Sequence, residues 1–235
     1  MFIPLYDDNP LAHVARPYAN YMLIALTVLA FLVTGTSGDL YLQHAAFSLG
    51  LVPSVVNDIK ELPPDYVWIP EGASYVTYAF LHSDLLHLGG NMLFLWVFGD
   101  NIEDAVGHLK YPVFYLLCAA AGGFAHTVLD PQSEVPLIGA SGAVSGIIGA
   151  YLMLHPRVRI WVLLIGKIPL PLSAAIVLSL WFAYQVFNFV SAYYVESHVS
   201  WPAHIGGFLA GAVLIVLLKR RDVVLFDKPL AGASR

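Results

Sequence analysis

Charged residues are scarce in this chain of 235 residues: they make up 11% of it, whereas hydrophobic residues make up 58%. A soluble globular domain carries about 25% charged residues. The mean hydropathy of +0.71 points the same way. The composition therefore disfavours an ordinary soluble domain and predicts a protein that exposes much of its surface to lipid.

Cysteine and an N-terminal basic segment are also almost lacking. The single cysteine, Cys118, excludes an intrachain disulfide and a cysteine metal cluster. The first residues, "MFIPLYDDNP", contain Asp7 and Asp8 where a signal peptide would carry positive charge. We therefore expect no cleaved leader, and no metal or other cofactor.

Long apolar runs are plentiful. A transmembrane helix needs roughly 20 mainly apolar residues, and six segments qualify: about 18–36, 82–100, 111–129, 137–155, 171–192 and 201–218. Residues 40–56 and 159–172 are too short or too interrupted by glycine and proline, and we expect them at the membrane interface. The connection 37–81 is too long for a turn. The predicted fold is an all-α membrane protein: a six-helix bundle with a long, partly membrane-associated loop between its first two spans.

Basic residues indicate the orientation. If both termini are cytoplasmic, ten of the eleven Lys and Arg residues fall on the inner side and only Lys60 on the outer. This asymmetry supports that topology under the positive-inside rule. We expect a cytoplasmic N-terminal segment 1–17, a six-span domain 18–218 and a cytoplasmic tail 219–235.

Polar residues recur near the outer ends of the second, fourth and sixth spans, which all enter from the outside. Ser141 precedes Arg157 by 16 residues and His204 precedes Lys219 by 15. At 1.5 Å per residue, each lies roughly 23 Å from the inner surface. A hydroxyl and an imidazole at one depth can form a reacting pair.

Small residues would allow the fourth and sixth helices to approach closely, because GxxxG steps thin a helix surface in lipid. The Ser141 hydroxyl could then come within about 2.6–3.2 Å of the His204 imidazole. The residues expected to provide this packing are Gly139, Gly142, Gly146, Gly207 and Gly211.

Acidic residues are absent from the segments 111–129, 137–155, 171–192 and 201–218. The usual triad orients its histidine with an acid, so we predict a dyad in which Ser141 is the nucleophile and His204 the general base. His87 and Asn91, spaced i, i+4, project from one face of the second span. With the Ser141 backbone N–H, they are candidate donors to an oxyanion.

Other interpretations stay open. Small-residue runs in membrane helices commonly serve packing alone, and Ser145 is expected to bond to a carbonyl one turn earlier. Four histidines in or next to the spans lack the paired spacing of a zinc site; they are His82, His87, His126 and His204. A non-catalytic membrane adaptor that binds transmembrane helices in the same groove is the main alternative function. A transporter is weaker, because the spans lack buried charges for ion coupling.

Three stretches together resemble the rhomboid intramembrane serine proteases. They are "GASG" with Ser141, "HLGGN" with His87 and Asn91, and "AHIGGFLAG" with His204. The stretch "FGDNIEDAVGHLKYPVFYLLC" resembles the family's link between the second and third spans, and "PLYDDNP" is similar to the start of many prokaryotic members. The resemblance covers nearly the whole chain.

The resemblance implies Ser141 as nucleophile, His204 as base, and an oxyanion site made of His87, Asn91 and the Ser141 N–H. It implies cleavage of transmembrane segments of membrane-protein substrates near their outer ends, and suggests the plasma (inner) membrane of a prokaryote. It also implies a mobile fifth span and following loop, near residues 181–198, that admit substrate. Some members place a tyrosine on the catalytic histidine, four residues after the nucleophile; that position is Ser145 here.

Overall fold

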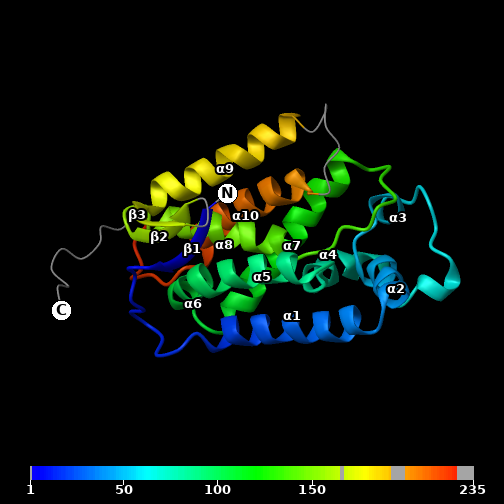
Figure 1. The fold of residues 1–235 in the computed structure, drawn as a ribbon, viewed down its shortest axis with the longest axis horizontal. Coiled ribbons are helices and arrows are strands. Elements are labelled where there is room, and N and C mark those ends of the chain that lie inside the picture. Colours follow the sequence, from blue (N-terminus) through cyan, green and yellow to red (C-terminus); the bar gives the residue numbers. More distant parts are fainter. Residues whose placement is uncertain (1, 165–166, 192–198, 227–235) are drawn as a thin grey trace.

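The computed structural model describes residues 2–164, 167–191 and 199–226. Its elements, in chain order, are β1 (Phe2–Asp7), α1 (Tyr18–Thr36), α2 (Asp39–Leu49), α3 (Pro53–Val56), η1 (Pro64–Tyr66), η2 (Glu71–Ala73), α4 (Ser74–Thr77), η3 (Tyr78–Phe80), α5 (Leu85–Phe94), the π-helix η4 (Leu95–Gly99), α6 (Asp100–Val106), α7 (Lys110–Leu129), α8 (Ser141–Leu154), β2 (Arg159–Leu164), β3 (Ile168–Ser173), α9 (Ala174–Ser191) and α10 (Trp201–Leu218). The long helices run roughly along one axis of the molecule (Figure 1). Residues 192–198 of the connection predicted to be mobile, and residues 227–235 of the predicted tail, lie outside the described residues.

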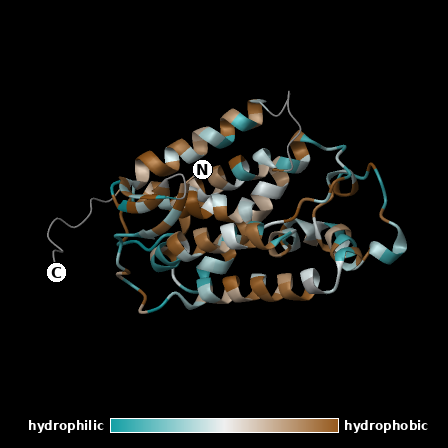
Figure 2. Ribbon diagram, viewed as in Figure 1, coloured by the Kyte–Doolittle hydropathy of each residue, from teal (hydrophilic) through white to brown (hydrophobic). Residues whose placement is uncertain are grey.

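Within the described residues, four helices are long and apolar enough to cross a membrane: Tyr18–Gly35 of α1, and all of α7, α9 and α10. The ribbons of α1 and α9 are largely hydrophobic (Figure 2). Several large apolar side chains on these two helices are exposed, for example Leu29 and Phe187. Exposing such an apolar surface to water would be unfavourable, whereas contact with lipid is not. The chain is therefore an integral membrane protein.

The other two predicted spans coincide with shorter or segmented helices. α8 has 14 residues. The segment predicted at 82–100 begins at Leu85 and continues as α5, η4 and α6 to Val106. The count of six spans therefore remains a prediction.

α8 forms the centre of the bundle. Nearly all of its residues are buried, because it packs between α7 and α10 and also contacts α5, η4 and α9. Large side chains of neighbouring elements fill the space around it, among them Phe98, Tyr115 and Phe208. A helix surrounded by protein needs no lipid-facing surface, which explains why it can be short and rich in small residues.

A small sheet corrects the all-α expectation. β1, β2 and β3 form an antiparallel sheet in that order, with Phe2 opposite Leu164 and Arg159 opposite Ser173. The central strand β2, "RIWVLL", has no proline, whereas Pro4, Pro169 and Pro171 lie on the two edge strands, where a missing N–H is tolerated. The described residues of the segment 159–172, which was expected to be an interfacial stretch, form β2 and most of β3.

The connection between α1 and α5 is largely ordered. Within it, α2 packs on η1 through stacked rings: the centroids of the His44 and Tyr66 rings lie 4.1 Å apart, and the ring planes meet at 15°. A β-bridge joins Leu51 to Leu137, just before α8. The long predicted loop is therefore a set of short helices, and the Leu51–Leu137 bridge joins it to the bundle. Its contact with lipid remains a prediction.

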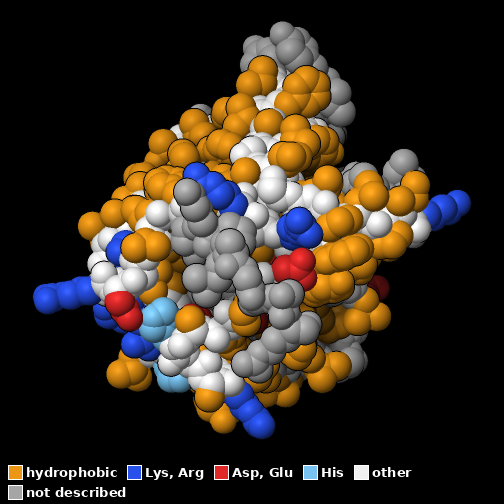
Figure 3. Space-filling model, turned by 90° about the vertical axis from the view of Figure 1, so that its left-hand side faces the viewer, with side chains coloured by type: hydrophobic (Ala, Val, Ile, Leu, Met, Phe, Trp, Pro, Cys, Tyr) orange, Lys and Arg blue, Asp and Glu red, His pale blue; other side chains and the backbone are white. Residues whose placement is uncertain are grey.

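The N-terminal segment and the chain after α10 meet at the same end of the bundle. The Arg220 backbone N–H donates to the Ala105 carbonyl at 2.8 Å. Asp104 accepts from the backbone N–H groups of Ala12, His13 and Val14. Figure 3 views this end, where Lys and Arg side chains stand among hydrophobic ones. The N-terminal segment and residues 219–226 therefore lie on one side of the bundle, which agrees with the predicted topology; the orientation in the membrane remains a prediction.

The His13 side chain, in the N-terminal segment, lies between two carboxylates: Asp104 on α6 and Asp222 in the chain after α10. Its Nδ1 lies 3.0 Å from Asp104 Oδ2 and its Nε2 lies 3.1 Å from Asp222 Oδ2. A neutral imidazole has one N–H, so only the protonated ring donates to both. The hydrogen bond to Asp104 is the main cause that raises the pKa of His13 above its ordinary value of 6.5, against the effect of burial.

We expect the His13 bridge to stabilise the protein below about pH 6.5 and to lose its effect at higher pH. The folded state favours the protonated ring, so its stabilisation is complete below the unfolded-state pKa and disappears as pH rises through the raised pKa. The difference in Tm between wild type and His13→Gln in detergent should be largest near pH 6 and vanish toward pH 9. Asp222→Asn should reproduce part of the effect. A difference that does not vary with pH would contradict this role.

Candidate functional site

Ser141 is the first residue of α8. Gly139, which precedes it by two residues, has φ +124°, a conformation that L side chains rarely adopt. A β-carbon there would lie 2.6 Å from His87 Nε2. Gly139 therefore contacts the His87 ring and lies outside the helix, rather than packing one helix on another as expected. The backbone N–H groups of the first turn of α8 have no partner within the helix.

His204 lies in the first turn of α10. Ser200 caps this helix by accepting from the Ala203 N–H at 3.3 Å, and its hydroxyl lies 2.9 Å from Nδ1 of His126 on α7. The ring of Trp181 on α9 lies 6.2 Å from the His204 ring, nearly parallel to it. Trp201 approaches His204 edge-on at 6.1 Å. His204 is thus enclosed by α9 and its own helix.

Glycines bring α8 and α10 into backbone contact. A β-carbon on Gly207 would overlap the Gly142 carbonyl oxygen, and one on Gly211 would overlap that of Gly146. A β-carbon on Gly142 would lie 3.6 Å from the Ala203 carbonyl oxygen. Because Gly142 touches both Ala203 and Gly207, the neighbouring residues Ser141 and His204 lie at one level of two facing helices.

No hydrogen bond joins the Ser141 hydroxyl to the His204 imidazole, and within the described part of the chain that hydroxyl has no partner. The neighbouring hydroxyl is engaged: Ser145 Oγ donates to the Ser141 carbonyl at 2.6 Å. This confirms the bond predicted for Ser145, whose hydroxyl proton is directed at the Ser141 carbonyl. The Ser141 side chain is half-buried, whereas Ser145 is fully buried.

His87 and Asn91 both lie on α5, one turn apart, as their spacing predicts. Asp84 caps this helix by accepting from the N–H groups of Leu86 and His87, each at 2.9 Å. The contact between His87 and Gly139 brings the ring to the start of α8. Asn91 is buried and its Nδ2 lies 3.0 Å from His82 Nε2.

His82, to which the sequence assigned no role, connects these donors to α8. Its Nε2 accepts from the Asn91 amide and, at 3.3 Å, from the Ala140 backbone N–H. Its ring lies 4.9 Å from that of His87. The sequence shows a histidine shortly before "HLGGN", but its burial and its partners depend on how residues 137–141 enter the bundle.

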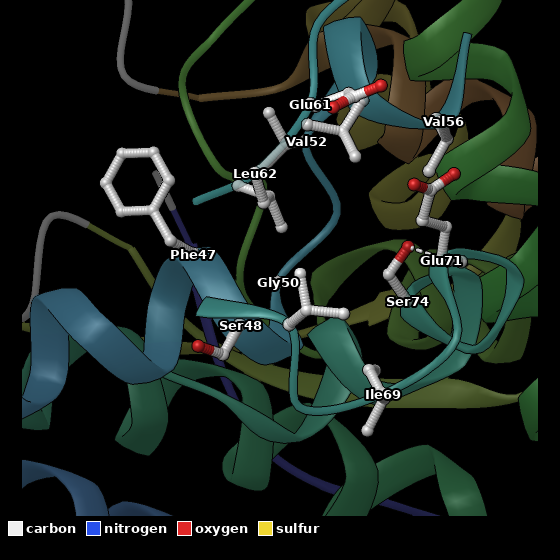
Figure 4. Close-up of a pocket in the computed structure, with 12 residues that line it drawn as sticks. Phe47, Ser48, Gly50, Val52, Val56, Glu61, Leu62, Ile69, Glu71 and Ser74 are labelled. Carbon is white, nitrogen blue, oxygen red and sulfur yellow. Dashed lines mark hydrogen bonds between the residues drawn. The ribbon is translucent and has the colours of Figure 1, made fainter. Parts of the chain in front are cut away.

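Among the described residues, no group of three or more His, Cys, Asp or Glu side chains is arranged to hold a metal ion. A cavity of about 200 Å³ lies elsewhere, in the connection between α1 and α5. Its walls come from the end of α2, residues 50–56 and residues 61–74 (Figure 4). None of the predicted site residues lines it.

The sequence of this chain is similar to a known family of proteins. The rhomboid domain profile matches residues 70–221, more than half of the chain. RHOMBOID-like protein 5 of Arabidopsis thaliana is 33% identical over 146 residues, which are 60% of this chain and 42% of that protein. Rhomboid protein 1, mitochondrial, of Saccharomyces cerevisiae is 28% identical over 176 residues, 72% and 49% of the two chains.

A bacterial relative is aligned over more of this chain. Rhomboid protease GluP of Bacillus subtilis is 26% identical over 222 residues, 93% of this chain and 38% of that protein. The chain spans about half the length of the curated relatives it matches, or less. The matched region contains Ser141, His204, His87 and Asn91. With its apolar helices and this domain match, the chain belongs to the rhomboid family of membrane proteins.

Proposed function

We propose that this protein is an intramembrane serine endopeptidase that hydrolyses peptide bonds in or next to transmembrane segments of membrane-protein substrates. Ser141 is the nucleophile and His204 the general base. The observation that carries the proposal is the contact of Gly142 with both Ala203 and Gly207, because it puts a hydroxyl and an imidazole at one level of two touching helices. Family membership supports the same reaction.

The chemistry follows from these roles. Ser141 Oγ attacks the scissile carbonyl carbon while His204 Nε2 takes the hydroxyl proton. The tetrahedral intermediate collapses, the C–N bond breaks, and His204 gives the proton to the leaving amine. Water, activated by the same imidazole, then hydrolyses the acyl-enzyme. In a substrate-free enzyme the hydrogen bond between nucleophile and base is often long and shortens only in the complex with substrate. The absence of a Ser141–His204 hydrogen bond in this substrate-free structure is therefore compatible with the proposed roles.

The oxyanion would form next to the first turn of α8. There, the Ser141 N–H and the helix dipole both favour negative charge. The Asn91 amide has a second N–H besides the one directed at His82. His87 lies against Gly139, two residues before the nucleophile. We infer that these three donors, from α5 and α8, act on one oxyanion.

The length of α8 supports a site below the outer membrane surface. Its 14 residues span about 21 Å, whereas the hydrocarbon core is about 30 Å thick. If α8 ends at the inner surface, Ser141 lies several ångströms inside the outer one. We infer that both termini lie on the cytoplasmic side, as the distribution of basic residues suggests. The likeness of the start "PLYDDNP" to prokaryotic members of the family supports the plasma membrane of a prokaryote as the location.

The direct experiment uses the purified chain reconstituted into liposomes with a single-span reporter protein. We expect two fragments, with the cut mapped by mass spectrometry to a bond near the outer end of the reporter's span. Co-purification of the intact reporter without cleavage would instead indicate a non-catalytic adaptor that binds transmembrane helices.

Removing an oxyanion donor should slow the reaction without unfolding the protein. Asn91→Ala is expected to lower kcat about 100- to 1,000-fold, because the donor acts mainly on the charge of the transition state. The matched control is Asn57→Ala, since among the described residues the Asn57 amide bonds to the Pro53 and Thr127 carbonyls and to none of the proposed site residues. An Asn91→Ala enzyme with wild-type kcat would remove Asn91 from the oxyanion site.

A further inference from the structure

The His204 ring has a partner on α9 that the sequence did not reveal. Nδ1 of His204 lies 2.8 Å from Oε1 of Gln185, a side chain that is 3% exposed. A buried amide at hydrogen-bond distance from an imidazole determines which ring nitrogen holds the proton, provided that the amide itself has one orientation.

The orientation of the Gln185 amide follows from the contact made by the amide atom that does not face His204. Its Nε2 lies 3.2 Å from the Trp181 backbone carbonyl oxygen. A carbonyl only accepts, so the group that faces it must be the NH₂. The amide oxygen therefore faces His204, and because that oxygen also only accepts, Nδ1 must carry the proton.

We propose that Gln185 is a positioning residue that holds His204 in the Nδ1–H tautomer and leaves Nε2 unprotonated. This inference rests on the proposed function, in which Nε2 takes the proton from Ser141. Gln185 then supplies from a neighbouring helix what a carboxylate supplies in the usual triad, as the neutral amide does in Cys-His-Asn proteases.

The neutrality of the partner fits its surroundings. The described parts of α7 to α10 contain no Asp or Glu, and an unpaired carboxylate would be costly to bury there. Ser145, four residues after the nucleophile, bonds to the Ser141 carbonyl and has no ring to stack on the imidazole. Trp181, one turn before Gln185 on α9, stacks on His204 instead. The same helix thus provides both the acceptor and the stacking ring.

The test compares Gln185→Met, Gln185→Glu and a control, Asn188→Leu. Asn188 lies one turn along α9 and donates to the Tyr184 carbonyl at 2.7 Å, as Gln185 does to Trp181, but its amide bonds to no histidine among the described residues. Gln185→Met keeps the shape and removes the acceptor. It should lower kcat at least about tenfold with little change in KM, but less than the roughly 10⁴-fold loss caused by fixing the wrong tautomer.

Gln185→Glu should restore activity at high pH, because a carboxylate also accepts from Nδ1. Its negative charge stabilises the imidazolium, so the acidic limb of the pH profile of kcat/KM should move to higher pH than in wild type. Asn188→Leu should leave both kcat and the pH profile unchanged. Equal loss of kcat in Gln185→Met and Asn188→Leu, or no rescue by glutamate, would reduce Gln185 to a structural role and overturn the proposal.

A measurement independent of activity separates this inference from the proposed function. The ¹⁵N NMR spectrum of histidine-labelled protein, with His204 assigned from its loss in His204→Ala, should show an unprotonated Nε2 in wild type and a mixture of tautomers in Gln185→Met. An unprotonated Nδ1 in wild type would refute the role of Gln185. The expected tautomer in a protein that cleaves no substrate would refute the proposed function alone.

Discussion

Replacing Ser141 by alanine is expected to lower kcat for a transmembrane substrate by about 10⁴-fold or more, because loss of the nucleophile removes the covalent pathway. The fold should survive. The Ser141 side chain is half-buried, its hydroxyl has no partner in the described part of the chain, and its carbonyl would still accept from Ser145. The measurement is substrate cleavage in liposomes, with Tm in detergent reporting on folding.

Ser145→Ala is the matched control for Ser141→Ala. It removes a hydroxyl from the same helix, one turn further along and more deeply buried, whose only described bond is to the Ser141 carbonyl. Cleavage should remain within a few-fold of wild type. If Ser141→Ala cleaved as well as Ser145→Ala, another residue would be the nucleophile.

Replacing Gly207 by valine should disrupt the fold itself, whereas Ser141→Ala should abolish activity and leave the fold intact. A β-carbon on Gly207 would overlap the Gly142 carbonyl oxygen, which is backbone and cannot rotate away. Overpacking a core costs typically 1–3 kcal/mol and more where the backbone must move. Because the total stability of a domain is only about 5–15 kcal/mol, we expect a large fall in Tm and loss of the monodisperse peak in gel filtration.

Gly90→Ala provides the control for that substitution. Gly90 also lies inside a helix, α5, but a β-carbon there would meet nothing within 4 Å. Alanine is a better helix former than glycine by about 1 kcal/mol, so Tm should stay constant or rise. A Gly207→Val protein as stable as Gly90→Ala would show that α8 and α10 are not in backbone contact.

Much of this architecture could be predicted from sequence, because apolar length and glycine spacing are local signals. The helices α1, α7, α9 and α10 lie close to the predicted segments. Ser145 bonds to the carbonyl one turn earlier, as a serine in a membrane helix commonly does. Counting residues along two helices with a known rise predicts Ser141 and His204 at one depth, and the contact of Gly142 with Ala203 and Gly207 is consistent with that prediction.

Other features depend on tertiary contacts that sequence periodicity does not encode. The strand β1 pairs with β2 across more than 150 residues, and the prolines in β3 concealed its pairing with β2. Gly139 belongs to the same small-residue run as Gly142, yet its positive φ places it in the turn before the helix. The bond from His204 to Gln185 requires a particular rotation of α9, which an apolar helix with no clear polar face does not reveal.

Covalent labelling tests most directly whether His204 activates Ser141. A fluorophosphonate should modify the wild-type protein in detergent, and mass spectrometry should find the adduct on Ser141 and on no other serine. His204→Ala, with an unchanged Tm, should react at least about 100-fold more slowly, because the hydroxyl would have lost its base. Labelling at another serine, or equal rates in wild type and His204→Ala, would contradict the account.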